Sequence, residues 1–509
     1  MEIDNYKKNL TSEQKLGKYN VLTIFFKIVS IFFVFIIQLF CIHLLLKSDY
    51  IKIIVILLDI VSIIHLMKYS IKKEYKRNWI VIILLFPILG FLIYWIFGNN
   101  TLSKEKIKKL NSIEERNKKI IGKSNFVDNL KLKQFEKYSR YKAYKNQGIE
   151  YFGHGEELFE DLKSELKNAK KSILIEMYII SKGKLLDEIL NILDMKIKDG
   201  VDVEIIYDSF GSMFKIPKKI KNKILNSGIK LYEYSKFTLD ISGYMNHRDH
   251  KKIIVIDGKI AYTGGINISD EYVNKKELYG YWKDSGIKLY GNIVLSYLLM
   301  YLKVREEITN ENIDYNRYIL NKDYVESNEG WNFSFSDGPD NLKNTIENVL
   351  INVIQNSKEY LYITTPYFMP SKIILNSVID AAKRGVNVVL LTPYIADKKI
   401  VEFTNRSYYD KLLENGVKIY EYKYGFIHSK ELVSDEISII GTINLDYKSL
   451  YFNYECANLS YKTGIEKKIK KEFENTLKES IFIDEEKFKK RSIIQKIEEK
   501  VAYFLSPLF

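Results

Sequence analysis

Residues 246–272 read NHRDHKKIIVIDGKIAYTGGINISDEY, and residues 426–449 read FIHSKELVSDEISIIGTINLDYKS. Both stretches contain the pattern H-x-K-x4-D followed by G-x-x-N. The residues of the pattern are His250, Lys252, Asp257, Gly264 and Asn267 in the first stretch, and His428, Lys430, Asp435, Gly441 and Asn444 in the second. The chain has six histidines, and two of them occupy the same place in the two copies. The repetition therefore predicts a duplicated unit with a functional histidine in each copy.

The segments around the two patterns also recur in a fixed order. Strand-like runs KSILIEMYII (171–180), GVDVEIIYD (200–208) and SGIKLYEY (227–234) correspond to YLYITTPYF (360–368), GVNVVLLTPY (385–394) and NGVKIYEY (415–422). Amphipathic helical patterns separate the runs, which is typical of α/β units. The sequence predicts two duplicated α/β domains, residues 148–325 and 326–509, that together form one pseudo-twofold catalytic unit.

The first 98 residues differ from the rest and are predicted to be a membrane anchor of two or three transmembrane helices. Apolar runs cover residues 28–46, 53–67 and 79–97, and a 19-residue helix spans roughly 28 Å, close to a bilayer core of about 30 Å. The second run is shorter and contains Asp59 and His65. Basic residues flank both ends of the third run. Because positive charge prefers the cytoplasm, one straight span cannot place both ends on the preferred side, and two arrangements stay open. Either the first two runs form a hairpin and the third dips in and returns around Pro87 and Gly90, or all three are ordinary spans.

Both arrangements leave the large C-terminal part in the cytoplasm. Residues 101–146 contain 14 Lys or Arg against 5 Asp or Glu, within a chain of net charge +14. We expect residues 99–147 to be a basic juxtamembrane linker that lies against anionic headgroups, although a nucleic-acid patch has a similar composition. Only two cysteines, Cys41 and Cys456, are present. We therefore expect no disulfide framework, no metal and no cofactor.

The spacing of histidine and lysine in the pattern suggests a reaction at phosphorus. Side chains at i and i+2 of a strand share a face, so two facing strands would bring two histidines and two lysines into one pocket. Lys252 and Lys430 can neutralise the oxygens of a phosphodiester, while one of His250 and His428 attacks phosphorus and the other protonates the departing alkoxide. Asp257 and Asp435 complete the two patterns and are predicted to be catalytic with the histidines and lysines. Asp257 also starts an Asp-Gly turn, so either it takes part in the chemistry or it holds the turn.

Other polar residues follow the two patterns. Asp284 and Glu455 lie 34 and 27 residues after the histidine of their own repeat and are predicted to hold an imidazole through its second ring nitrogen. Asn267, Asn444 and Thr442 either donate to phosphate oxygens or simply form the Gly-rich turns.

With these motifs the chain resembles the phospholipase D superfamily. The stretches at 79–100, 267–272, 281–284, 444–455 and 505–509 are similar to bacterial cardiolipin synthases in particular. This resemblance implies a membrane enzyme of the bacterial cell that joins two phosphatidylglycerol molecules into cardiolipin and releases glycerol, through a phosphatidyl-histidine and without a metal. It implies His250 as nucleophile and His428 as general acid. The alternative is a hydrolase that releases phosphatidic acid. A nuclease fits poorly with an apolar anchor, so no nucleic-acid partner is expected. The oligomeric state stays open.

The second copy of the pattern is one residue shorter than the first. Five residues separate Asp435 from Gly441, whereas six separate Asp257 from Gly264. A deletion within a strand would turn the following side chains to the opposite face, but a deletion in the turn only tightens it. We therefore predict that the missing residue lies in the turn.

Overall fold

The computed structural model describes residues 47–69, 72–122, 130–236, 246–319, 329–341 and 343–508, together with residues 38, 40 and 43. The chain divides into two compact units. The smaller unit contains residues 1–102, 238–247 and 504–509, and the larger unit contains residues 103–237 and 248–503. The larger unit carries both copies of the repeated pattern.

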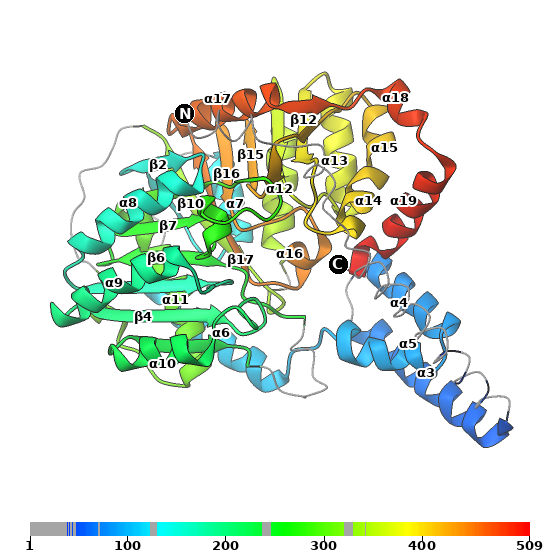
Figure 1. Ribbon diagram of the computed structural model, residues 1–509, viewed down its shortest axis with the longest axis horizontal. Helices are drawn as coiled ribbons and strands as arrows, with labels where there is room; N and C mark the ends of the chain where they lie inside the picture. Colours follow the sequence, from blue (N-terminus) through cyan, green and yellow to red (C-terminus); the bar gives the residue numbers. More distant parts are fainter. Residues whose placement is uncertain are drawn as a thin grey trace. The chain divides into compact units, whose positions relative to one another are not determined.

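The larger unit is built on two mixed β-sheets, and each sheet comes mainly from one repeat (Figure 1). The first has the order β2-β9-β7-β6-β3-β4-β5, with β2 Ile149–Phe152, β3 Ser172–Met177, β4 Asp202–Asp208, β5 Lys230–Tyr234, β6 Lys252–Ile256, β7 Ile260–Gly264 and β9 Gly286–Tyr290. The second has the order β1-β10-β17-β16-β15-β11-β12-β13-β18, with β1 Ala143–Lys145, β10 Trp331–Asp337, β11 Tyr360–Thr364, β12 Asn387–Pro393, β13 Lys418–Tyr422, β15 Glu431–Ser434, β16 Ile437–Gly441, β17 Glu455–Tyr461 and β18 Ser480–Phe482.

Corresponding strands of the two sheets pair in the same way. Strands β3, β4 and β5 are parallel, as are β11, β12 and β13, and in each sheet the strand that follows a histidine, β6 or β15, runs antiparallel to the first of the three. Every residue of β3, β6 and β11 is buried, which explains their nearly continuous apolar sequence. The predicted duplicated α/β fold is confirmed.

Helices pack around the sheets of the larger unit, and most of them are amphipathic. They are α6 Lys104–Ile121, α7 Leu130–Tyr138, α8 Gly155–Asn168, α9 Lys184–Lys198, α10 Lys218–Asn226, α11 Val294–Thr309, α12 Thr345–Asn356, α13 Lys372–Lys383, α14 Lys399–Ser407, α15 Tyr409–Leu413, α16 Tyr447–Tyr451, α17 Ile465–Lys478, α18 Glu485–Lys489 and α19 Ile493–Leu505, with short 3-10 turns at Asp270–Val273, Gly291–Ile293 and Tyr315–Arg317. The end of α19 and a 3-10 turn at Ser506–Leu508 belong to the smaller unit. Each repeat has its own apolar core, around Ile175 and Ile254 in the first and around Phe335 and Ile363 in the second. Burial of side chains of this size stabilises the fold by about 1.5–3 kcal/mol each.

The hairpin that follows each histidine explains the unequal motif lengths. Ile256 is paired with Ile260, so residues 257–259 form the first loop, whereas Ser434 is paired with Ile437, so residues 435–436 form the second. The strands on either side keep equivalent registers. The prediction that the missing residue lies in the turn is confirmed.

The two halves also contact each other through backbone. Strand β14, Gly425–Ile427, pairs in parallel with β8, Tyr281–Lys283, and an isolated bridge joins Asp249 to Tyr454. The first contact brings the segment before His428 next to the segment before Asp284. The second brings the segment before His250 next to the segment before Glu455.

The predicted linker contributes to the larger unit. Helix α6 packs on α11, where Lys106 Nζ lies 2.6 Å from a Glu307 carboxylate oxygen and Arg116 pairs with Glu306. Strand β1 pairs with β10 as an edge of the second sheet. Residues 104–121 and 143–145 are therefore folded parts of this unit, and the role of residues 99–147 as a basic juxtamembrane linker that contacts headgroups stays a prediction.

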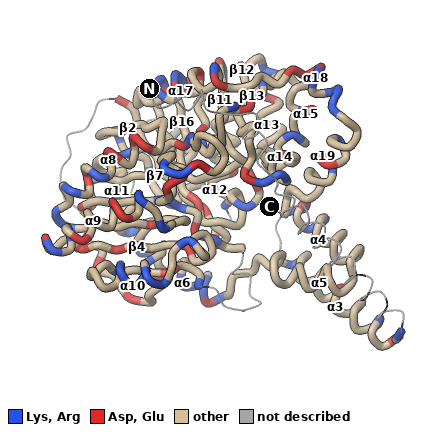
Figure 2. The backbone as a smooth tube through the Cα atoms, in the orientation of Figure 1, with Lys and Arg blue, Asp and Glu red and all other residues tan. Residues whose placement is uncertain are grey.

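In the smaller unit the apolar runs form α3 (Asp49–Tyr69), α4 (Lys73–Leu85), α5 (Leu89–Ile93) and a π-helical turn at Tyr94–Gly98. Within the described residues, α3 is the one helix long and apolar enough to cross a membrane. Its 21 residues correspond to about 32 Å, so the helix formed by the second run extends beyond the apolar residues 53–67 at both ends. Figure 2 shows few charged residues along α3 and α5. The first predicted run lies largely outside the described residues, and the number of spans stays a prediction.

The third apolar run is broken in the middle. The helix ends at Leu85, and Pro87 cannot donate the backbone hydrogen bond that would continue it. Beyond the break, Gly90 lies so close to α4 that an added Cβ would stand 2.6 Å from the carbonyl oxygen of Ile82. The run is therefore two helical pieces packed on each other. This shape fits the predicted segment that dips in and returns better than one straight span.

Candidate active site

Backbone hydrogen bonds between the halves position both histidines. The amide of His250 donates to the carbonyl of Tyr454 at 2.9 Å, and the amide of His428 donates to the carbonyl of Lys283 at 2.7 Å. Tyr454 precedes Glu455, and Lys283 precedes Asp284. Each histidine is thus held beside a carboxylate from the opposite repeat.

The side chains complete the same crossed arrangement. His250 Nδ1 lies 2.9 Å from both carboxylate oxygens of Glu455, and His428 Nδ1 lies 2.7 Å from Asp284 Oδ2. An ionised carboxylate only accepts hydrogen bonds, so we assign the proton of each neutral imidazole to Nδ1. The Nε2 atoms then carry the lone pairs, and neither has a hydrogen-bond partner among the described residues. The sequence predicted these carboxylates as histidine partners, but the pairing across the halves was not foreseen.

Burial keeps both histidines neutral in this structure. It lowers the pKa of His250 to about 4, and the nearby ammonium groups of Lys252 and Lys430 act in the same direction against the raising effect of Glu455. Burial and Lys430 lower the pKa of His428 to about 3, while Asp284 opposes the shift. The lysines of both halves act on each histidine, which agrees with the crossed contacts that bring the two motifs together.

The two lysines are also buried. Burial lowers the pKa of Lys252 to about 8, and burial together with the Lys252 charge lowers the pKa of Lys430 to about 7, although both carboxylates of the site oppose these shifts. Each Nζ donates to the backbone carbonyl of the histidine two residues earlier, at 2.7 Å for Lys252. Two closely spaced buried cations favour an anionic ligand, because such a ligand would compensate their desolvation.

Burial alone would raise the pKa of Asp284 and Glu455, but the histidines and lysines outweigh it, and both pKa values lie below the ordinary range. These carboxylates are therefore ionised. Further groups hold them: the amide of Ser285 donates to Asp284 at 2.8 Å, and Asn453 Nδ2 donates to Glu455 at 3.2 Å.

Asp257 and Asp435 lie at the opposite ends of their strands from the histidines. Asp257 accepts hydrogen bonds from the amides of residues 170–172, and Asp435 accepts them from the amides of residues 358–360. Both adopt left-handed backbone conformations, with φ of 53° and 48°, which Asp tolerates in turns. For Asp257 these bonds favour the second of the two predicted roles, that of holding the turn, and for Asp435 they speak against the predicted catalytic role: each fixes the start of β3 or β11 against the hairpin.

The three predicted phosphate donors are placed differently from one another. Thr442 donates to Glu455 and to the carbonyl of Cys456, so it supports a carboxylate. Asn267 accepts from the amide of Ile179 at 3.0 Å and donates to the Tyr272 hydroxyl at 2.6 Å. Asn444 is buried, and its Oδ1 has no partner among the described residues. Of the three, Asn444 is the one whose side-chain oxygen is left without a partner among the described residues.

Aromatic residues that the motif analysis did not select enclose the histidines. The Tyr178 ring meets His250 edge to face at a centroid distance of 4.7 Å, and Tyr272 and Trp282 lie 5.5 and 5.4 Å from His428. The sequence does contain a signal for the carboxylate Asp284, because Gly265 occupies in the first repeat the position of Thr442 in the second. A Cβ at Gly265 would lie 2.1 Å from Asp284 Oδ1, so the first repeat needs glycine where the second uses a hydroxyl.

Within the described part of the chain, no group of three or more His, Cys, Asp or Glu residues is arranged to hold a metal ion. The residues of the site are instead two imidazoles, two ammonium groups and two carboxylates. This set can bind an anion, provide a nitrogen nucleophile and move a proton.

Comparisons with known proteins agree with this assembly. A family model described as "Cardiolipin synthase, PLD-like domain" matches residues 162–287 and 350–477, and one described as "Phospholipase D-nuclease N-terminal" matches residues 57–99. An uncharacterized protein of Streptococcus mutans is 35% identical over 458 residues, 88% of this chain and 99% of that protein. Cardiolipin synthase 2 of Bacillus anthracis is 33% identical over 454 residues, 85% of this chain and 86% of that protein.

A solved structure shares the fold at low sequence identity. The phosphatidylserine synthase of Haemophilus influenzae superposes with a TM-score of 0.57 and 15% identity, covering 74% of this chain and all of that one. At this identity the match bears on the fold alone.

Proposed function

Because this chain belongs to the cardiolipin synthase family of the phospholipase D superfamily, we propose that it joins two phosphatidylglycerol molecules into cardiolipin and releases glycerol. The family makes it an enzyme of the phosphatidyltransferase type that acts on phospholipids. The observation that carries the proposal is the crossed pair of His–carboxylate contacts beside Lys252 and Lys430. A phosphodiester is the lipid group that such a site suits.

In the first step, His250 Nε2 attacks the phosphorus of one phosphatidylglycerol. A P–N bond forms, the bond from phosphorus to the glycerol oxygen breaks, and His428 gives its Nε2 proton to that oxygen. His428 is neutral in the free site, but the negative charge of the bound phosphodiester favours its protonation. Asp284 and Glu455 stabilise the positive charge on the imidazoles, as the carboxylate does in a hydrolase triad.

In the second step, the hydroxyl of another phosphatidylglycerol replaces glycerol. It gives its proton to His428 Nε2, its oxygen bonds to phosphorus, and the P–N bond to His250 breaks. Lys252 and Lys430 offset the negative charge that accumulates on the non-bridging oxygens in both steps. The unpartnered oxygen of Asn444 supports a contact between this residue and the headgroup. We assign these residues roles in catalysis and binding, and Asp257 and Asp435 positioning roles.

Mass spectrometry of the products tests the proposal. Purified full-length protein in detergent is given phosphatidylglycerol, with His250→Ala, His428→Ala and, as a matched histidine control, His154→Ala run in parallel. We expect cardiolipin and glycerol from the unchanged protein and from His154→Ala only. Phosphatidic acid in place of cardiolipin would make water the acceptor and favour the hydrolase. Full activity in either catalytic variant would refute the shared site.

We also propose that the N-terminal region anchors the enzyme in the bacterial cell membrane in more than one pass, with the catalytic unit in the cytoplasm. The length of α3 supports a crossing of the membrane, and the basic residues around α4 support this orientation. Labelling of single cysteines at positions 48 and 72 in intact cells and in inverted vesicles tests it. If both ends of α3 react from the same side, α3 does not cross the membrane.

A further inference from the structure

Helix α19 carries an apolar stripe that nothing in the described structure covers. Ile493, Ile494, Ile497 and Val501 recur at helical spacing, and their exposed fractions are 77%, 70%, 56% and 54%. Soluble surfaces rarely leave a contiguous row of large aliphatic side chains in water. The stripe therefore indicates a surface that meets another apolar phase.

Contacts on the other side of α19 fix which face points outward. Glu499 is buried and accepts from Arg491 at 2.8 Å, and Arg491 also pairs with Asp410 of α15. Ala502 is fully buried. Because these anchors lie opposite the stripe on the helix, the helix cannot turn the stripe inward without breaking the Arg491 ion pairs.

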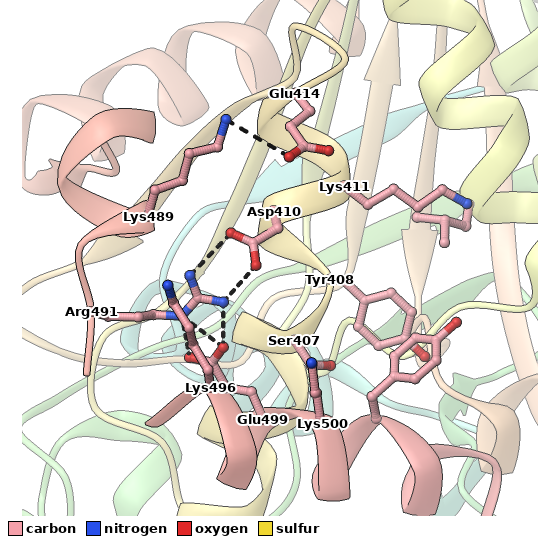
Figure 3. Close-up of a pocket in the computed structure, with 12 residues that line it drawn as sticks. Ser407, Tyr408, Asp410, Lys411, Glu414, Lys489, Arg491, Lys496, Glu499 and Lys500 are labelled. Atoms are coloured by element: carbon pink, nitrogen blue, oxygen red, sulfur yellow. Dashed lines mark hydrogen bonds and ion pairs between the residues drawn. The ribbon is translucent and has the colours of Figure 1, made fainter. Parts of the chain in front are cut away.

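A basic edge runs along the stripe. Lys496 and Lys500, one helical turn apart, have no ionic partner among the described residues. They border a cavity of about 660 Å³ beneath the helix, which is lined by five Lys or Arg and three Asp or Glu residues. Figure 3 shows Lys496 and Lys500 rising from α19 beside Arg491 and Ser407. The acidic residues Asp410 and Glu499 are already engaged by Arg491.

We propose that α19 lies in the surface of an anionic bilayer, with its aliphatic stripe among the upper acyl chains and Lys496 and Lys500 at the phosphates. An apolar helix face with lysines along its edge is the pattern of an interfacial helix. Protein interfaces instead concentrate Trp, Tyr and Arg at their centres, and the stripe consists of Ile and Val. The inference goes beyond the proposed reaction, because it concerns how the catalytic unit is held at its substrate's surface.

The test uses the full-length chain with Cys41→Ser, reconstituted in nanodiscs that contain or lack phosphatidylglycerol. An environment-sensitive fluorophore is placed at Ile497→Cys, with Lys468→Cys on exposed α17 as the control position. Lipids with nitroxides on the acyl chains act as quenchers. We expect strong quenching and blue-shifted emission at position 497 and neither at position 468. The readout needs no turnover, so it is independent of the proposed reaction.

A charge reversal completes the test. Lys496→Glu with Lys500→Glu should weaken the docked state by at least about fivefold per lysine in phosphatidylglycerol nanodiscs, whereas the equally spaced pair Lys467→Glu with Lys471→Glu on α17 should leave it unchanged. Equal quenching at positions 497 and 468 would overturn the proposal. So would blue-shifted emission that is absent in dilute samples and rises with protein concentration without lipid, since that result assigns the stripe to a second copy of the chain.

Discussion

Replacement of Glu455 by glutamine is expected to abolish most of the activity without unfolding the protein. Both carboxylate oxygens lie 2.9 Å from His250 Nδ1. The amide of glutamine can donate to Nδ1, and this favours the imidazole tautomer that has its proton on Nε2, where the lone pair is needed. A change of this kind costs about 10⁴-fold in kcat in a Ser-His-Asp enzyme, or about 5.5 kcal/mol of barrier. We expect a loss of the same order for Glu455→Gln.

The assay is the initial rate of cardiolipin formation from phosphatidylglycerol in mixed micelles, with thermal unfolding measured on the same samples. Glu431→Gln is the matched control: Glu431 is also a buried glutamate near the start of a strand, but it pairs with the Tyr151 hydroxyl at 2.9 Å. Burial raises the pKa of Glu431, so a neutral amide suits its position. We expect Glu431→Gln to stay within a few-fold of the unchanged rate.

A graded variant sharpens the reasoning. Thr442→Val removes one donor to Glu455 and leaves the contact with His250 in place, so a loss of about tenfold is expected, from about 1.5 kcal/mol for one charge-assisted hydrogen bond. If Glu455→Gln keeps more than a tenth of the activity while its stability is unchanged, the crossed carboxylate does not set the tautomer and the reasoning fails.

Three further outcomes are expected. The pKa of Lys430 is lowered to about 7, so Lys430 loses its positive charge as the pH rises through 7, and kcat/KM should fall there. Lys430→Arg should move this fall to higher pH. An unchanged pH profile in the variant would contradict the role of this charge. Asp257→Ala removes the acceptor of three backbone amides and should lower the free energy of unfolding, measured by urea titration, by about 2–4 kcal/mol. The kcat of the folded variant should change only a few-fold. A larger loss of kcat would assign Asp257 a catalytic role. A chelator should leave the rate unchanged, and inhibition that added divalent metal reverses would refute the metal-free mechanism.

The repeated strands and the two histidine motifs could be predicted because their signals are local. A histidine and a lysine two residues apart share a strand face whatever surrounds the strand. The turn deletion was predictable for a similar reason, since register depends on alternation.

The partners of the histidines could not be assigned in this way. Asp284 and Glu455 were recognised, but which carboxylate meets which histidine depends on the pairing of β14 with β8 and on the bridge from Asp249 to Tyr454. These contacts join segments far apart in the sequence. Asp257 illustrates the opposite error, because its place in a shared motif suggested chemistry, whereas its carboxylate binds the backbone at the other end of β6.

Because each histidine contacts a carboxylate of the other repeat, the site is complete only when both repeats have folded and met. Neither repeat alone contains both a motif histidine and the carboxylate that orients it, so the two halves cannot each provide a weaker version of the site. A chain in which only one half has folded would therefore contain neither histidine beside its carboxylate. Under the proposed mechanism such a chain could not cut lipids prematurely, and the completion of folding and the start of catalysis would be the same structural event.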